Sequence, residues 1–79
     1  MDIKYTYRES DSDSIRKAEL VASGGGEIEF VVREERKELD VALWIYNGGR
    51  KDHALASFNK NDFADFAALV NRINKQING

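Results

Sequence analysis

The hydrophobic pattern of this chain changes its period once, and this change constrains the fold more than any other feature. Up to Phe58 the apolar residues mostly alternate with polar ones, which is the two-residue period of a β-strand. From Phe63 onward they recur every three or four residues, which is the period of an amphipathic helix. We therefore predict an α+β fold, in which a four- to five-stranded antiparallel meander sheet carries one C-terminal amphipathic helix packed on one face.

The start of the helix is marked by capping chemistry. Asn59 fits an N-cap, and Asp62 three residues later meets the positive end of the helix. Phe58 and Phe63 have the spacing of a hydrophobic staple. The apolar residues that then share one face are Phe63, Phe66, Ala67, Val70, Ile73 and Ile77. These signals predict a helix over about 60–77, with Gly79 just past its end.

Two strands are predicted at about 27–33 and 38–46, where apolar and polar residues alternate. With Glu34–Lys37 as a four-residue loop, the apolar residues of both strands fall on one face, and a slip by one residue would destroy that match. The register is therefore well specified. The cross-strand pairs expected from it are Val32 with Leu39, Phe30 with Val41, Ile28 with Leu43, and Arg33 with Glu38.

Further strands are predicted at about 2–8, 16–23 and 51–58, with a polar loop over residues 9–14. A three-residue loop at Gly24–Gly26 would place Leu20 opposite Phe30. Residues 14–22 also suit a short helix, because good helix formers precede a glycine stop. We favour the strand, and the helix remains open.

The loop before the last strand decides which residues of that strand face the helix. Asn47-Gly48-Gly49 is a turn signal. A two-residue loop would point Ala54, Ala56 and Phe58 toward the helix, whereas a three-residue loop would point His53, Leu55 and Ser57 there. We favour the first, because Phe58 must meet the helix.

Composition limits the chemistry of the chain. Its 79 residues form one domain, 1–79, with 12 Lys+Arg, 14 Asp+Glu and a formal net charge of −2. The absence of Cys excludes a thiol nucleophile, and one His with scattered carboxylates matches no metal-ligand spacing. No apolar run approaches a membrane span and no signal peptide is visible. We expect a cytoplasmic protein that is not an enzyme and uses no cofactor, metal or membrane.

The sheet face turned away from the helix is the informative feature. It is more apolar than a solvated face, with Trp44 as its largest residue. Three interpretations stay open. Strand 2–8 or loop 9–14 covers Trp44, or Trp44 lies at an edge; a homodimer packs through this face or through the helix; or the face is a platform on which a ligand stacks. The candidate nucleic-acid or partner-binding residues are Trp44, Tyr46, Arg33, Arg36, Lys37, Arg50, Lys51, His53 and Leu55.

The order of elements resembles the positive-cofactor-four transcriptional coactivators, their bacterial and phage relatives, and the Pur repeats. The similarity covers about residues 16–77 and is most visible at Leu39–Trp44 and Ala54–Phe66. It implies a curved four-stranded meander with one helix, single-stranded DNA binding, and commonly a dimer. The bacterial relatives carry a basic, glycine-containing stretch before the last strand, whereas here Arg50-Lys51 is followed by Asp52-His53.

Two functions follow as hypotheses. The first is a single-stranded nucleic-acid binding module with a transcription-cofactor-like role, in which bases stack on Trp44 and Tyr46. Each stacked base contributes roughly 1–3 kcal/mol. The second is an acidic protein-binding module, such as a phage- or mobile-element-encoded inhibitor of a host protein complex, or an accessory subunit. Its anchors would be Trp44, Tyr46 and Leu55.

The charge around Trp44 separates these hypotheses. Basic surroundings favour nucleic acid, whereas crowding by Glu27, Glu29 and Asp40 favours a protein. The resemblance inclines the sequence interpretation toward nucleic acid. A homodimer is a further expectation, because Leu69 and Ile77 would be left partly exposed on the helix.

Overall fold

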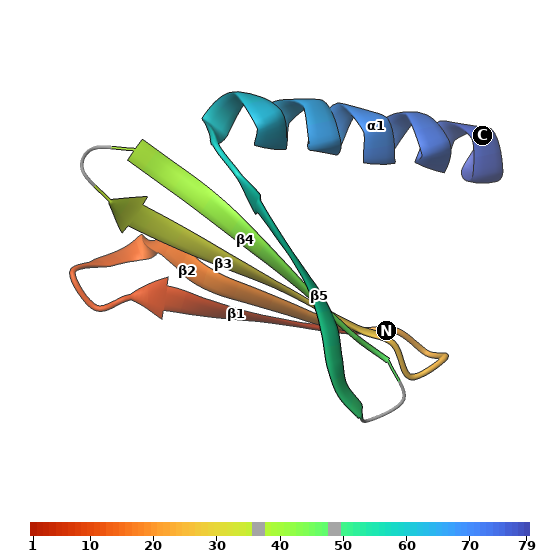
Figure 1. Ribbon diagram of the computed structural model, residues 1–79, viewed down its shortest axis with the longest axis horizontal. Coiled ribbons are helices and arrows are strands. Elements are labelled where there is room, and N and C mark those ends of the chain that lie inside the picture. The colour runs from red at the N-terminus through yellow and green to blue at the C-terminus, as the bar shows by residue number, and fades with distance from the viewer. Residues whose placement is uncertain (36–37, 48–49) are drawn as a thin grey trace.

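A computed structural model describes the backbone of residues 1–35, 38–47 and 50–79, and the side chains of residues 1–34, 40–46 and 55–79. The chain forms one five-stranded antiparallel sheet in the order β1-β2-β3-β4-β5, followed by one helix (Figure 1). The elements are β1 (Asp2–Arg8), β2 (Asp11–Val21), β3 (Glu27–Glu35), β4 (Glu38–Asn47), β5 (Arg50–Phe58) and α1 (Lys60–Asn78). The predicted α+β fold, a meander with a C-terminal helix, is confirmed.

Strand β2 is longer than predicted. It begins at Asp11, so a loop over residues 9–14 is wrong, and so is the helix considered for 14–22. Pairing with β1 reaches Asp11, which lies opposite Arg8, and the side chains of Asp11 and Asp13 are exposed. The pairing of β1 with β2 shifts twice near Tyr7, which bends this end of the sheet.

The hairpin between β2 and β3 shows that the predicted pairing was wrong by two residues. Leu20 lies opposite Ile28, not Phe30. The loop is Ser23–Gly25, closed by a hydrogen bond of 2.8 Å from the Ala22 N–H to the Gly26 carbonyl. Gly25 has a φ of 92°, the left-handed conformation that ends a three-residue hairpin loop of this kind. Since the period of a strand is two, the faces of β2 are unchanged.

The hairpin between β3 and β4 is displaced in the same way. Glu34 and Glu35 continue β3 and pair with β4, so the predicted four-residue loop Glu34–Lys37 is wrong; residues 36–37 lie outside the described part. Backbone pairing offers more hydrogen bonds when the strands extend to Glu35 and Glu38. The observed pairs are Val32 with Val41, Phe30 with Leu43, Ile28 with Ile45, and Arg33 with Asp40. Arg33 therefore keeps an acidic cross-strand neighbour, but it is not Glu38.

Strand β5 has the predicted orientation. Phe58 lies opposite Val41 and Ala56 lies opposite Leu43, so the interpretation that placed His53, Leu55 and Ser57 on the helix side is wrong. Residues 48–49 of the turn lie outside the described part. We call the sheet face that carries Phe58 the inner face and the opposite one the outer face.

Helix α1 begins as its sequence predicts. The Asn59 side chain accepts a hydrogen bond of 2.8 Å from the Asp62 N–H, and Gly79 closes the other end through the Lys75 carbonyl. Aromatic packing attaches the helix to the inner face. The ring centroids of Phe58 and Phe63 are 6.2 Å apart, which is the predicted staple. The complete cluster is Phe30, Phe58, Phe63 and Phe66.

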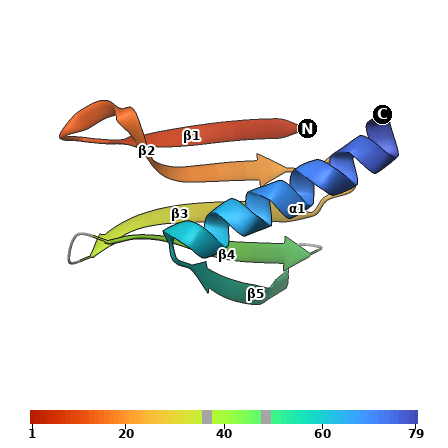
Figure 2. The same cartoon turned by 90° about the horizontal axis from the view of Figure 1, so that it is seen from above.

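The helix covers only part of the inner face. It contacts the ends of β4 and β5 and the Phe30 ring of β3, while the strands diverge from its C-terminal half (Figure 1). Seen from above, α1 crosses β3 and β4 obliquely and β1 lies apart from it (Figure 2). Among the described side chains, the buried ones are Ala42 at 1% and Leu43 at 8% exposure. The monomer thus has a very small core.

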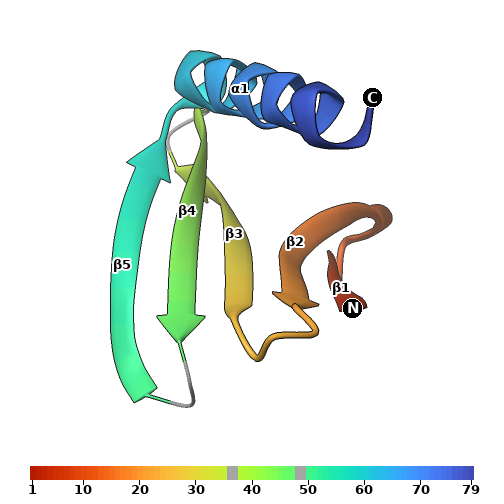
Figure 3. The same cartoon turned by 90° about the vertical axis from the view of Figure 1, so that its right-hand side faces the viewer.

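The sheet is strongly curved (Figure 3). The curvature brings Arg8 at the end of β1 to Glu34 of β3, across the intervening β2, where the two side chains form an ion pair. Both ends of this pair are partly solvent-exposed, so its contribution to stability is small. The pair nevertheless shows that, beyond the register irregularity near Tyr7, the end of β1 turns toward β3.

The conformation of Gly25 gives a first prediction. Gly25→Ala should lower the free energy of unfolding by about 1 kcal/mol, because a β-carbon strains the left-handed backbone. No heavy atom lies within 4 Å of the β-carbon position at either Gly24 or Gly25, so packing is not involved. Gly24→Ala, whose backbone lies outside the left-handed region, is the matched control and should be neutral. Urea denaturation measures both, and equal losses would contradict the loop assignment.

Candidate functional site

Strand β4 places Trp44 and Tyr46 on the outer face. Successive residues of a strand point to opposite faces of the sheet, so both point away from the face of Leu43. Leu43 lies opposite the inner-face residues Phe30 and Ala56. The prediction that these two aromatic residues point away from the helix is therefore confirmed. Their cross-strand neighbours are Glu29 and Leu55 for Trp44, and Glu27 and His53 for Tyr46.

The centre of the outer face is an apolar layer. Trp44 and Tyr46 are half-buried, and Leu55 is 50% exposed. Ala42 lies on the same face and is almost fully buried, so larger side chains of this face cover it. Strand β1 is three strands away from β4, so the interpretation that residues 2–8 or 9–14 cover Trp44 is wrong. Strand β4 lies between β3 and β5, so the interpretation that places Trp44 at an edge is wrong as well. The layer is built from residues of β3, β4 and β5 themselves.

Carboxylates flank the two aromatic residues on the β3 side. Glu29 is the direct cross-strand neighbour of Trp44, and Glu27 is that of Tyr46. Glu19 of β2 lies opposite Glu29 and extends the same row. These three glutamates and Tyr46 border a small hollow of about 40 Å³. The part of the outer face beside the aromatic pair is therefore negatively charged.

One of these carboxylates is held by a lysine. The Lys17 ammonium donates to the Glu19 carboxylate at 2.8 Å. This hydrogen bond, more than the charge attraction beside it, lowers the pKa of Glu19 and raises the pKa of Lys17. The Lys17 ammonium also attracts the Glu29 carboxylate, whereas Glu27, the neighbour of Tyr46, forms no ion pair among the described side chains.

Among the basic candidates, Arg33 is the one whose side chain the structure describes. Arg33 lies on the exposed outer face beside Asp40, toward the opposite end of β3 from Glu27. Arg36 and Lys37 lie outside the described residues. Arg50, Lys51 and His53 belong to β5, where the backbone is described and the side chains are not. By register His53 is a neighbour of Tyr46.

Glu19 is the site residue that the sequence analysis missed. The predicted hairpin loop at Gly24–Gly26 would place it opposite Val31, whereas the observed loop places it opposite Glu29. A three-residue loop needs a glycine at its third, left-handed position. Gly25 meets this need in the observed loop, but Gly26 would meet it equally in the predicted loop, so this signal does not separate the two registers.

Among the described residues, no group of three or more His, Asp or Glu side chains is arranged to hold a metal ion. Within the same part of the chain, no helix is long and apolar enough to cross a membrane. The chain matches no family model, no curated protein and no solved structure. Its function must therefore be inferred from the side chains of the outer face.

The Lys17–Glu19 pair gives a second prediction. Lys17→Met should raise the pKa of Glu19, because the hydrogen bond that favours the carboxylate is lost. In the wild type this pair stabilises the fold above the pH range in which unfolded glutamate titrates, and the gain is lost as the pH falls through the lowered pKa. At the alkaline end the gain is lost as the pH rises through the raised pKa of Lys17.

Carboxyl-detected NMR titration measures the pKa of Glu19 directly. Lys60→Met, on the helix and away from this pair, is the matched control and should leave the Glu19 titration unchanged. An unchanged Glu19 titration in Lys17→Met would contradict the assigned contact.

Proposed function

We propose that this protein is a non-enzymatic module that binds another protein on the outer face of its sheet. The observation that carries the proposal is the pairing of Trp44 with Glu29 and of Tyr46 with Glu27. Apolar anchors bordered by carboxylates fit a partner that presents apolar side chains flanked by Lys or Arg. A small accessory subunit or an inhibitor of a larger complex has this character.

The anchors are suited to a protein interface. Interface binding energy is concentrated in a few aromatic and apolar residues at the centre of the contact, surrounded by a polar rim. Leu55 is half-exposed beside Trp44, and the two form one cross-strand pair. Val21, 41% exposed on the same face of β2, extends the apolar surface beyond the glutamate row. Covering these residues removes apolar area from water, which favours association.

The same carboxylates weaken the case for nucleic acid. A phosphate backbone over Trp44 and Tyr46 would pass beside Glu27 and Glu29, and like charges repel most strongly where water is displaced. The chain as a whole carries a net charge of −2, so long-range attraction does not offset this repulsion.

Single-stranded nucleic acid is a second candidate, and one observation favours it. Arg33 is exposed on the outer face, and the register brings the β5 positions of His53 and Leu55 beside the aromatic pair. Bases stacked on Trp44 and Tyr46 would then have carboxylates of β3 beside them and Arg33 further along the same strand. Charge reversal at Glu29 separates this candidate from a protein partner, because the two respond in opposite directions.

The third prediction uses this opposite response. Glu29→Lys should weaken capture of the protein partner about tenfold, because a partner rich in Lys or Arg loses an attractive neighbour. Leu55→Asp should weaken it about 10- to 100-fold through loss of an apolar anchor. The measurement is affinity capture from a nuclease-treated lysate of the source organism, followed by titration of the captured protein. Ala68→Asp, exposed on α1, is the control and should bind like the wild type.

The competing function has its own readout. Trp44 is the single tryptophan, so its emission reports directly on the outer face. Titration with oligothymidine at low salt should leave this emission unchanged in the wild type. Quenching that becomes stronger in Glu29→Lys would overturn the protein-binding proposal in favour of single-stranded nucleic acid.

A further inference from the structure

The inner face of the sheet is apolar far beyond the part that α1 covers. Cross-strand pairing places ten positions in two rows that run across all five strands, and none of these positions carries a charged residue. One row is Ile3, Leu20, Ile28, Ile45 and Ala54, and the other is Tyr5, Ala18, Phe30, Leu43 and Ala56. The aromatic cluster of α1 touches the second row at Phe30. Ile3 and Ile45 of the first row remain 53% and 43% exposed.

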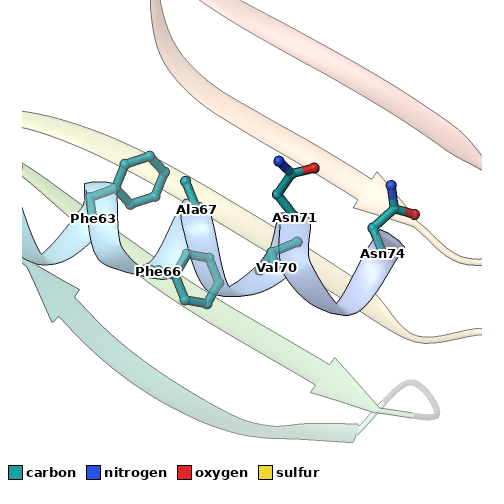
Figure 4. A pocket seen from close by; sticks show the side chains of 6 residues that line it. All are labelled: Phe63, Phe66, Ala67, Val70, Asn71 and Asn74. Atoms are coloured by element: carbon teal, nitrogen blue, oxygen red, sulfur yellow. The ribbon is translucent and has the colours of Figure 1, made fainter. Parts of the chain in front are cut away.

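The apolar stripe of α1 is likewise packed against the sheet along only part of its length. Its first two turns contact the sheet through Phe63 and Phe66, but Val70, Ile73 and Ile77 are about half or more exposed. An open hollow of about 340 Å³ lies along the middle of the helix, lined by Phe63, Phe66, Ala67, Val70, Asn71 and Asn74 (Figure 4). The helix and the inner face therefore form two walls of one apolar surface that diverges toward the helix C-terminus.

The exposed area of the chain measures how much surface is left without a partner. A folded monomer of this mass has an accessible surface of about 4,900 Å², whereas this chain exposes 6654 Å², an excess of roughly 1,800 Å². Permanent dimers bury about 1,000–2,500 Å² on each subunit. The excess thus has the size that one subunit of a permanent dimer hides.

We propose that a second copy of this chain occupies this surface. In the dimer, the α1 stripe of each copy lies across the uncovered inner-face row of the other, so that Ile73 of one chain meets the row of Ile3 and Ile45 of its partner. This proposal concerns the inner face and is independent of the partner proposed for the outer face.

Two features favour a second copy over a different protein. The chain itself carries both halves of the contact, a helix stripe and a sheet row, as a two-fold interface requires. Neither half carries charge, because Asp65, Arg72 and Lys75 lie on the other side of the helix. A partner chosen by charge complementarity has nothing to recognise here.

The fourth prediction is that the full chain is a dimer in solution. Sedimentation equilibrium at micromolar concentration should give about 18 kDa, twice the 9.0 kDa of one chain. The thermal midpoint should rise with protein concentration. Ile73→Asp should raise the dissociation constant at least about 100-fold, because a two-fold interface buries the new carboxylate twice.

Two control variants locate the interface. Ala68→Asp adds the same charge to the same helix on the side opposite to the stripe, and it should remain dimeric. Leu55→Asp, on the outer face, should also remain dimeric, although it should lose the partner proposed for that face. A wild-type chain that stays monomeric, or an Ile73→Asp variant that stays dimeric, would overturn the proposal. A larger assembly would overturn its two-fold arrangement.

A second measurement keeps the proposal testable if Ile73→Asp fails to fold. The chain has no Cys, so Ile73→Cys carries one nitroxide label at a known place. Mixed with isotope-labelled wild type, it should broaden the amide signals of Ile3, Tyr5 and Ile45 in the labelled copy more than those of the outer-face residues Val31 and Leu55. Stronger broadening on the outer face would assign the contact to that face and overturn the proposal.

Discussion

The packing of four phenylalanine rings is the interaction on which this architecture depends. Phe30 and Phe58 of the sheet meet Phe63 and Phe66 of the helix, with ring centroids 5.1 to 6.3 Å apart. Aromatic pairs of this kind contribute about 0.5–1.5 kcal/mol each beyond the area they bury. Most helical stability in proteins comes from the packing of an amphipathic face, so α1 depends on this contact. A single residue, Asn59, separates β5 from α1 and holds the rings at the end of the sheet.

The cluster sits at one end of the helix, so the helix covers only a small part of the inner face. The two faces of the sheet therefore suit different partners. The outer face combines Trp44, Tyr46 and Leu55 with a row of glutamates, so it suits a partner of opposite charge. The inner face carries two uncharged rows that the helix covers only near Phe30, so it suits an apolar surface like itself. The association proposed above would add core to a chain of 79 residues in which few of the described side chains are buried.

The sequence predicts the faces of this sheet better than it predicts the neighbours. Both central hairpins pair two residues away from the predicted register, yet Trp44 remains on the outer face and Phe30 on the inner face. A displacement by two residues leaves every side chain on the same face of the sheet. A displacement by one residue would move the apolar side chains to the other face, and only this error conflicts with the hydrophobic pattern. The cross-strand neighbour of Trp44 is accordingly Glu29, where the predicted loop would have placed Glu27. The residues of the candidate site were thus identifiable, but their electrostatic surroundings were not.

The sequence by itself determined the order of the elements, the residues on each face and the start of the helix at Asn59. These properties depend on the period of apolar residues and on capping groups within a few positions of one another, which are local. The tertiary structure decided the register of the hairpins and the small part of the inner face that α1 covers. The register follows from loop conformations such as that of Gly25, and the coverage follows from the direction in which the phenylalanine cluster holds the helix. Neither is contained in the alternation of apolar and polar residues.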